Sequence, residues 1–377
     1  MAGKKIVVAS MDPDSKEEKW VYKNGFKEKP GPKKSAYAES ITRLLRQNNY
    51  EVIEDWGPSY GRNKPNDDIG LVMAMHGLRG VDCWADRFNY LDSLCPNVWC
   101  LMGSHLNDDY VIYDRLGYSG GNSFAQDPTL WGDIAKADLD QAEKLHSQLA
   151  NKYIAGNQSK YDQPDKTDFE SEPFVAILGR VSGDSSTYFT NFKGEQINHN
   201  HANYSRTMWI ALNELNKWGV KILYKSHPRE YGTWSWNVRE IIKSGIWPNV
   251  SIVDDVGIHQ LFDKSKGVVT INSGAGFEAL LHLKPVVTLG KVDYSVATFN
   301  CSNTDDIAKA KDFVLMPSSS VNYREHQAFI KKFLLRHHEE RAVTHRNPDI
   351  NPYLDAVRKI LGPEVAREQY GDRFNEG

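Results

Sequence analysis

The sequence has no long apolar run and little cysteine. Across its 377 residues no window approaches the run of about 18 apolar residues that a membrane-spanning helix requires, so no such helix is expected. The four cysteines show neither CxxC nor Cys/His ligand spacing, which argues against a structural metal centre and favours reduced thiols. The short N-terminal run IVVA predicts a first β-strand and not a signal peptide. We therefore expect a cytoplasmic protein.

Charge does not select a partner for this chain. The formal net charge is −3 and the isoelectric point is near 6.5, so the chain has no general attraction to nucleic acid or to anionic lipid. An anionic ligand would have to be bound by a local group of cations. Nucleic acid is disfavoured as a partner, while peripheral membrane association and oligomeric state are left open.

Length and composition predict two globular domains. A chain of 377 residues exceeds one ordinary core, and its 40% apolar and 25% charged residues are typical of a globular protein. Short apolar runs alternate with amphipathic stretches, as in KIVVAS, SAYAESITRLLRQNN and IGLVMAMHG. This alternation predicts an α/β fold with parallel sheets covered on both faces. We expect two Rossmann-like domains facing a cleft, followed by C-terminal helices.

The polar segment NQSKYDQPDKTDFESEP contains two prolines and no apolar period, so it is predicted to be the interdomain linker. The predicted parts are an N-terminal Rossmann-like domain, a linker, a C-terminal Rossmann-like domain and terminal helices, at residues 1–156, 157–173, 174–320 and 321–377. The clearest terminal helices are EHQAFIKKFLLRHHEE and YLDAVRKILGPEVAREQ.

The segment VVTINSGAGFEALL is the first candidate site. An apolar strand runs into Asn272, Ser273 and Gly274 before an apolar helix begins. Small residues at a helix N-terminus let backbone N–H groups approach a phosphate. Glu278 could cap backbone donors or accept a hydrogen bond from a ribose hydroxyl. The same residues equally suit an N-cap and a tight turn, and they match neither GxGxxG nor a Walker motif.

The segment ILYKSHPRE is the second candidate site. Its strand ends at Lys225, and His227, Pro228 and Arg229 follow at the edge of the sheet where α/β folds bind ligands. The cations could receive a phosphate leaving group, with the histidine donating a hydrogen bond or a proton. A His-Pro pair alone is also typical of a structural turn. The functional interpretation is favoured by the Asn272–Gly274 loop, because loops that follow the strands of one parallel sheet emerge at the same edge.

The segment LGRVSGDSSTYF offers a carboxylate, Asp184, directly after a strand. A carboxylate at this edge can act as base or nucleophile toward a sugar carbon. An Asp-Ser turn that closes a strand-helix loop explains the residues equally well.

Together, YKSHPRE, NSGAGFEALLHLKPVVTLGKVDY, LGRVSGDSS and NQSKYDQP resemble the bacterial capsule polysaccharide biosynthesis transferases over roughly residues 157–295. That family includes enzymes that transfer Kdo, a sugar acid, from CMP-Kdo, and it is similar in fold to the GT-B class. The resemblance implies a glycosyltransferase whose second domain holds the donor and whose first domain faces the acceptor.

The resemblance also implies roles for individual residues. His227, Pro228, Asn272 and Ser273 would bind the donor nucleotide, with Lys225 and Glu278 as neighbours, and Asp184 matches the aspartate of the family's D-x-S loop at the anomeric centre. The donor would be a CMP- or UDP-linked sugar and the acceptor a glycan. No separate cofactor is expected.

Two features complicate this assignment. The acidic-Gly-Phe motif expected in the first domain appears only as LMGSHLND, so the acceptor carboxylate is undefined; Asp109 or Asp114 could replace it, and His76 is placed toward the cleft. Apart from Asp254 with Asp255 no metal-binding motif is evident, so metal-independent transfer is expected, with cations and helix N-termini offsetting the charge on the leaving phosphate.

Three alternatives remain at the level of sequence. The same fold could transfer glycerol phosphate, or it could glycosylate a modified base of phage DNA, against which the lack of a basic domain counts. The altered LMGSHLND segment also permits a non-catalytic protein that binds a nucleotide or carbohydrate.

Overall fold

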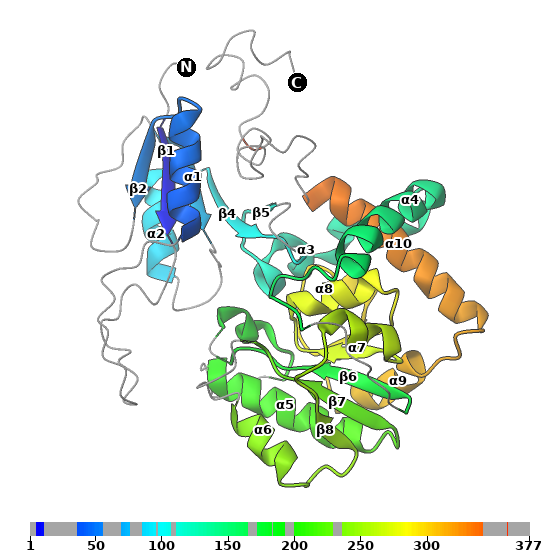
Figure 1. Ribbon diagram of the computed structural model, residues 1–377. Helices are drawn as coiled ribbons and strands as arrows, with labels where there is room; N and C mark the ends of the chain where they lie inside the picture. The colour runs from blue at the N-terminus through cyan, green and yellow to red at the C-terminus, as the bar shows by residue number, and fades with distance from the viewer. Residues whose placement is uncertain are drawn as a thin grey trace. The chain divides into compact units, whose positions relative to one another are not determined.

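The chain is described from a computed structural model (Figure 1). The structure describes residues 5–10, 36–55, 69–75, 85–95, 97–106, 111–164, 172–182, 184–192, 200–228, 236–341 and 360. Internal contacts divide the chain into two units. Unit 1 comprises Met1–Ser104, Asp108–Tyr118 and Arg341–Gly377, and unit 2 comprises His105–Asn107 and Ser119–Glu340.

Unit 1 contains a five-stranded sheet in the order β2-β1-β3-β4-β5, in which only the β4–β5 pair is antiparallel. Its strands and helices are β1 (Lys5–Ser10), α1 (Ala36–Gln47), β2 (Val52–Asp55), β3 (Ile69–Met75), α2 (Ala85–Leu94), β4 (Val98–Gly103) and β5 (Val111–Asp114). Ile41 and Leu45 of α1 pack in one apolar cluster with side chains of β1 to β4, and Ile360 also packs against that cluster. The amphipathic period read from residues 35–49 therefore corresponds to a helix that covers the sheet.

Unit 2 contains a six-stranded, wholly parallel sheet in the order β11-β10-β9-β6-β7-β8. Its strands are β6 (Phe174–Leu178), β7 (Lys221–Lys225), β8 (Val250–Ile252), β9 (Val268–Thr270), β10 (Val286–Thr288) and β11 (Phe299–Asn300). Counted along the chain, this is the 3-2-1-4-5-6 order of the Rossmann fold. The order reverses between β6 and β9, so the loops that follow these two strands flank the switch point of the sheet.

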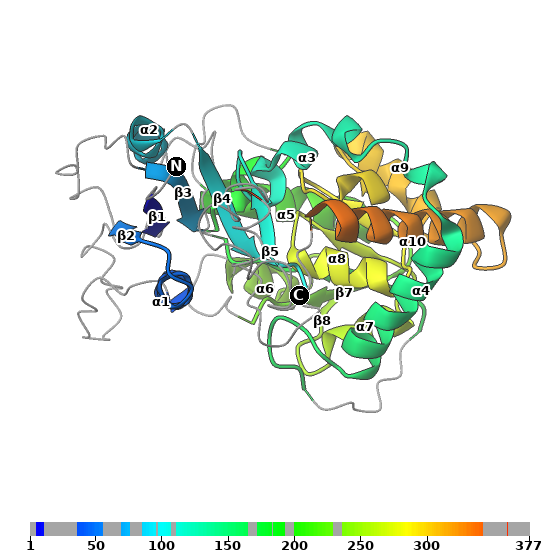
Figure 2. The same ribbon diagram turned by 90° about the horizontal axis from the view of Figure 1, so that it is seen from above.

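Helices cover both faces of the unit 2 sheet. The α-helices described in unit 2 are α3 (Ser123–Gln126), α4 (Leu139–Leu149), α5 (Asn200–Asn216), α6 (Trp236–Lys243), α7 (Ile258–Lys264), α8 (Gly274–Leu281), α9 (Thr304–Val314) and α10 (Val321–Arg341). Buried residues of α5, α6 and α9 form one core with the strands, while α7 and α8 lie on the opposite face (Figures 1 and 2). The α/β architecture with parallel sheets confirms the predicted fold class.

The division into units differs from the predicted boundary at 157–173. The structure places residues 119–156 in unit 2, because this stretch is bonded to it. Trp131 Nε1 donates to the carbonyl of Asp293 at 3.0 Å, and His146 Nε2 donates to the carbonyl of Leu281 at 2.9 Å. These contacts join residues more than a hundred positions apart, which sequence periodicity does not reveal.

The predicted helix EHQAFIKKFLLRHHEE lies within α10. Of the second predicted terminal helix, YLDAVRKILGPEVAREQ, only Ile360 belongs to the described residues. No helix within the described ranges has the length and apolar character needed to cross a membrane.

We expect Leu212→Ala to lower the free energy of unfolding of unit 2 by about 2–5 kcal/mol, because Leu212 is 0% exposed in the core beneath α5. Leu130→Ala makes the same chemical change at a position that is 50% exposed and should have an effect within about 0.5 kcal/mol. Urea unfolding followed by tryptophan fluorescence compares the two variants. Equal losses would show that the core has been placed on the wrong face of α5.

Candidate functional site

The three loops singled out in the sequence emerge at one edge of the unit 2 sheet. Asp184 follows β6, His227 follows β7, and Asn272 with Ser273 follows β9. Strand β6 lies between β7 and β9, and all three are parallel. The expectation that these loops share one sheet edge is thereby confirmed. The β6 and β9 loops flank the switch point, where parallel α/β sheets bind ligands.

Arg180, a residue that the sequence analysis did not select, joins the β6 and β9 loops. Its guanidinium donates to the carbonyl of Asn272 at 2.7 Å and also to Asn272 Oδ1. It further contacts Ser186 Oγ and lies 3.1 Å from Asp184 Oδ1. The side chain is buried, so the cation is neutralised and hydrogen-bonded within the site. The signal that could have identified Arg180 is its position directly after β6, four residues before Asp184.

Asp184 caps the 3₁₀ turn Ser185–Phe189. Its Oδ1 accepts from Ser186 N at 2.9 Å and from Ser186 Oγ at 2.6 Å. Burial opposes ionisation of the carboxyl, but Arg180 and the Ser186 hydrogen bonds outweigh it and hold the pKa of Asp184 below its usual range. In the described part of the chain the hydrogen bonds to the Asp184 carboxyl end on Oδ1, while the side chain is 36% exposed.

Asn272 links three loops at this edge of the sheet. Its Nδ2 donates to the carbonyls of Ser186 at 2.8 Å and Lys291 at 3.3 Å, and its Oδ1 accepts from Arg180. The side chain is buried. Its polar atoms hold the loops after β6, β9 and β10 together, so the structure assigns Asn272 a positioning role beside the predicted binding role.

Ser273 is the N-cap of α8, because its Oγ accepts from Ala275 N at 3.3 Å. Tyr294 Oη donates to the carbonyl of Ser273, and a Cβ on Gly276 would collide with that hydroxyl and with Thr270. The small residues therefore serve the turn and its packing. The backbone N–H groups of Ala275 and Gly276, in the first turn of α8, are both bonded to Ser273.

The loop after β7 is held by Asp254. Lys225 Nζ donates to the Asp254 carbonyl at 2.6 Å, Ser226 N donates to Asp254 Oδ1 at 3.3 Å, and Arg239 pairs with Asp254 Oδ2. Burial lowers the pKa of Lys225, although Asp254 and Asp255 oppose this change. Asp254, considered above as a metal ligand, is thus a partner of cations.

His227 and Pro228 follow at the half-buried and exposed end of this loop, where the ring of Tyr161 packs edge-on against His227 with centroids 5.1 Å apart. Arg229 lies outside the described residues.

Glu278 lies on α8 and is only 3% exposed. Burial raises the pKa of its carboxyl to about 8, although a hydrogen bond from Ser159 and the charge of Lys160 act in the opposite direction. Ser159 Oγ donates to Glu278 Oε1 at 3.0 Å, and among the described residues Oε2 has no hydrogen-bond partner. A protonated carboxyl with one unsatisfied oxygen can exchange hydrogen bonds with a ligand hydroxyl.

Residues 157–164, predicted as the start of a linker, are bound to α7 and α8. His259 Nε2 donates to the carbonyl of Gln158 at 2.7 Å, and Gln163 Oε1 accepts from Ile258 N at 2.7 Å, which caps α7. With the Ser159 bond to Glu278 and the Tyr161 contact with His227, this segment forms part of the site.

Of the candidate acceptor-side residues in unit 1, the structure describes Asp114. Asp114 is buried, and its Oδ1 accepts from Leu116 N at 2.8 Å and from Gly117 N at 3.3 Å, as a turn residue does. His76 and Asp109 lie outside the described residues.

The family described as capsule polysaccharide biosynthesis protein matches residues 136–335, more than half of the chain, and confirms the resemblance found in the motifs. No curated protein matches the sequence.

Among solved structures, the chain is similar to the beta Kdo 2,4 transferase of Thermosulfurimonas dismutans KpsC, with 15% identity, 87% of this chain and 96% of that chain covered, and a TM-score of 0.50. The beta Kdo 2,7 transferase of the same protein gives 15% identity, 86% and 89% coverage and a TM-score of 0.48. The UDP-GlcNAc 2-epimerase of Methanocaldococcus jannaschii is 11% identical, with 88% of this chain and 98% of that chain covered and a TM-score of 0.35. At 15% identity, the likeness to the beta Kdo 2,4 transferase concerns the fold alone.

We expect the contribution of Glu278 to the stability of the protein to fall as the pH rises from about 4.5 toward 8. The raised pKa of Glu278 means that the folded state binds one more proton than the unfolded state in this window, so the contribution present below the usual pKa of 4.5 is lost as the pH approaches about 8. The expected loss is about 1.4 kcal/mol per pH unit. Melting temperatures of the wild type and of Glu278→Gln, measured across this range, report the difference. Parallel pH profiles would rule out a buried, protonated Glu278.

Proposed function

The chain belongs to the family of capsule polysaccharide biosynthesis proteins, and on that premise we propose that it is a glycosyltransferase that moves a sugar from a nucleotide donor to a glycan acceptor. The observation that carries the proposal is the meeting of the β6, β7 and β9 loops at the switch point of unit 2. This edge presents an ionised carboxylate, a histidine and a helix N-terminus, which are the groups that displacement of a phosphate-linked sugar requires. The donor is assigned to unit 2.

Asp184 is proposed as the catalytic carboxylate. Arg180 and Ser186 hold Oδ1 and favour the ionised carboxyl, so we assign the reaction to Oδ2. As a base, Oδ2 accepts the proton of the acceptor hydroxyl while that oxygen attacks the anomeric carbon. As a nucleophile, Oδ2 itself forms the bond to the anomeric carbon, and in a second step the acceptor oxygen displaces Oδ2 from that carbon while the acceptor hydroxyl loses its proton to solvent. In both cases the bond between the sugar and the phosphate breaks, and its electron pair leaves with the nucleotide.

The leaving phosphate is proposed to lie between His227 and the N-terminus of α8, at Ser273 and Gly274. Lys225 is already bonded to the Asp254 carbonyl, so His227 is the side chain of this loop that we assign to the phosphate. Backbone N–H groups at a helix N-terminus favour an anion without a metal ion. Transfer is therefore proposed to proceed without added divalent cations, and a strict requirement for Mg²⁺ or Mn²⁺ would contradict this part of the proposal.

Glu278 is proposed to recognise a hydroxyl of the nucleotide ribose. Its carboxyl is protonated at neutral pH, Oε1 accepts from Ser159, and Oε2 is unsatisfied within the described residues. A ribose hydroxyl that pairs with Oε2 would remove this buried unsatisfied group, which costs about 1–3 kcal/mol when left unpaired.

CMP-Kdo is the donor that we propose to test first. The T. dismutans enzyme with the same fold is described as a beta Kdo transferase, and the D-x-S, His-Pro and Asn-Ser motifs of this chain resemble those of Kdo transferases. Mass spectrometry of products formed from CMP-, UDP-, GDP-sugar and CDP-glycerol donors, with glycan and DNA acceptors, separates sugar transfer from the alternative reactions. A product from CDP-glycerol alone would overturn the assignment to sugar transfer.

We predict that Asp184→Asn lowers kcat by at least about 1000-fold and changes donor affinity by less than about threefold, because the amide keeps the hydrogen bonds of Oδ1 but cannot accept a proton or attack carbon. Turnover and nucleotide affinity, the latter by calorimetry, are measured on the same preparation. Retained turnover would exclude Asp184 as the catalytic group.

Asp254→Asn is the matched control for this variant. It makes the same substitution in a neighbouring loop at a residue assigned to positioning, so its main effect should be on donor affinity and not on the chemical step. Rapidly quenched reactions of the wild-type enzyme, analysed by mass spectrometry of the protein, then distinguish a base from a nucleophile. Only a nucleophilic Asp184 would carry a covalently bound sugar.

We predict that His227→Ala weakens donor binding by about 10-fold or more, because one hydrogen bond to a charged phosphate is lost. His326→Ala, on α10, is the control and should leave donor affinity unchanged. Calorimetric titration with the nucleoside monophosphate and with the complete donor measures the effect. Unaltered affinity in His227→Ala would place the phosphate elsewhere.

A further inference from the structure

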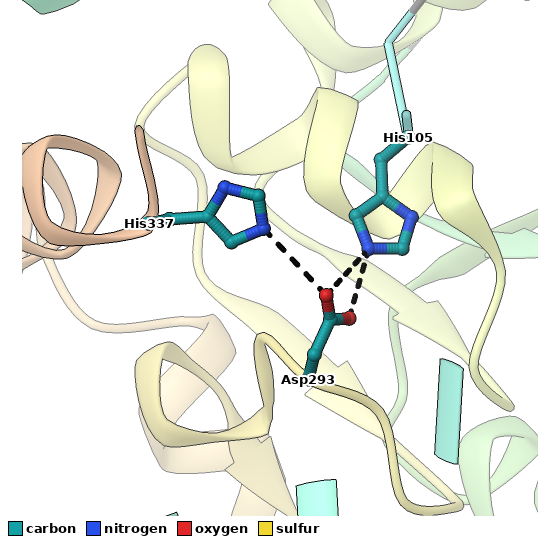
Figure 3. A group of neighbouring side chains, drawn as sticks. All are labelled: His105, Asp293 and His337. Atoms are coloured by element: carbon teal, nitrogen blue, oxygen red, sulfur yellow. Dashed lines mark hydrogen bonds and ion pairs between the residues drawn. The ribbon is translucent and has the colours of Figure 1, made fainter. Parts of the chain in front are cut away.

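Three ionisable side chains outside the proposed transfer chemistry meet inside unit 2. They are His105, which follows β4, Asp293 after β10, and His337 on α10 (Figure 3). His105 Nε2 lies 2.8 and 3.0 Å from the two oxygens of Asp293, and His337 Nε2 lies 3.6 Å from Oδ2. The three ligand atoms lie within 4.8 Å of one another. Segments distant in sequence thus direct two imidazole nitrogens and a carboxylate at one point.

The cluster is enclosed by protein. All three residues are buried, and the carboxylate of Asp293 is 0% exposed. The ring of Phe277 lies against both histidines, with centroids 5.2 Å from His105 and 4.6 Å from His337. Trp131 stacks on His337 and donates Nε1 to the carbonyl of Asp293. An aromatic shell of this kind excludes water and strengthens the interaction of the carboxylate with a cation.

We propose that His105, Asp293 and His337 form a binding site for a divalent transition metal ion, with Zn²⁺ as the ion that the donor set fits. Buried carboxylates in proteins are paired with cations or coordinate metals. Two imidazole nitrogens and one carboxylate oxygen are ordinary zinc ligands. In a tetrahedral site with bonds of about 2.0–2.1 Å, neighbouring ligand atoms lie about 3.3 Å apart. The separations of 2.8 and 3.6 Å lie on either side of that value.

The function of this ion is structural. It would tie α10 and the loop after β10 to the segment that follows β4. Metal binding to the folded state adds its free energy to folding. The site is distinct from Asp254, which is bonded to Arg239. A hydrogen-bonded His-Asp-His cluster without metal is the competing interpretation of the same geometry.

The first test is the metal content of tag-free protein purified without chelators. Inductively coupled plasma mass spectrometry should find about one Zn²⁺ per chain in the wild type. The same content is expected in His326→Ala, a matched histidine substitution on the same helix, α10. His337→Ala and Asp293→Asn should lose the metal. Another transition metal at one per chain, lost in both variants, also supports the site. Metal-free wild type that does not take up Zn²⁺ would overturn the proposal and leave the hydrogen-bonded cluster.

The second test does not depend on the stability of His337→Ala. Chelator-treated wild type is titrated with Co²⁺ and with Zn²⁺, and the visible absorption of Co²⁺ and the melting temperature are recorded. Tetrahedral Co²⁺ absorption that Zn²⁺ displaces, with a rise in melting temperature, is expected. Asp293→Asn, which preserves side-chain shape, should weaken Zn²⁺ affinity by about 100-fold or more. Equal affinity of Asp293→Asn and wild type would exclude this carboxylate as a ligand.

Discussion

The candidate site depends on one buried cation, the guanidinium of Arg180. It contacts Asp184 and Ser186 in the loop after β6 and two oxygens of Asn272 in the loop after β9. A buried cation is costly unless its donors are paired, so the two loops cannot separate without leaving a charge unsatisfied. The switch point of the sheet is consequently a fixed surface. The contacts of Arg180 with Asp184 and Asn272 thus set the positions of Asp184 and of the α8 N-terminus.

A second set of contacts reaches from this part of the sheet edge to the loop after β7. Residues 157–164 bond to α7 and α8 through Gln158, Ser159 and Gln163, and they bring Tyr161 to His227. The segment thereby connects the carboxyl on α8 with the histidine after β7. A polar stretch without an apolar period is an ordered part of the site, because its order comes from hydrogen bonds to helices and not from burial of its own apolar residues.

The cluster of His105, Asp293 and His337 lies next to the same helix. A Cβ on Gly274 would lie 3.5 Å from His105 Nδ1, and the residue after Asp293, Tyr294, donates its hydroxyl to the Ser273 carbonyl. The N-terminus of α8 therefore lies between two sets of contacts. Tyr294 bonds to Ser273 and His105 lies beside Gly274, while Arg180 bonds to Asn272 just before the helix. Two buried groups of polar residues therefore lie at the first turn of one short helix.

The sequence by itself determined the strand-helix alternation, the fold class and the three loops that carry Asp184, His227 and Ser273, because periodicity and turn residues are local properties of the chain. The family followed from the same motifs. Only the tertiary structure identified Arg180, assigned Asn272 and Asp254 to positioning, moved residues 119–156 into unit 2 and brought His105, Asp293 and His337 together. These features depend on hydrogen bonds and burial between segments up to 232 positions apart in the chain, and no local pattern records which distant partner a polar side chain will meet.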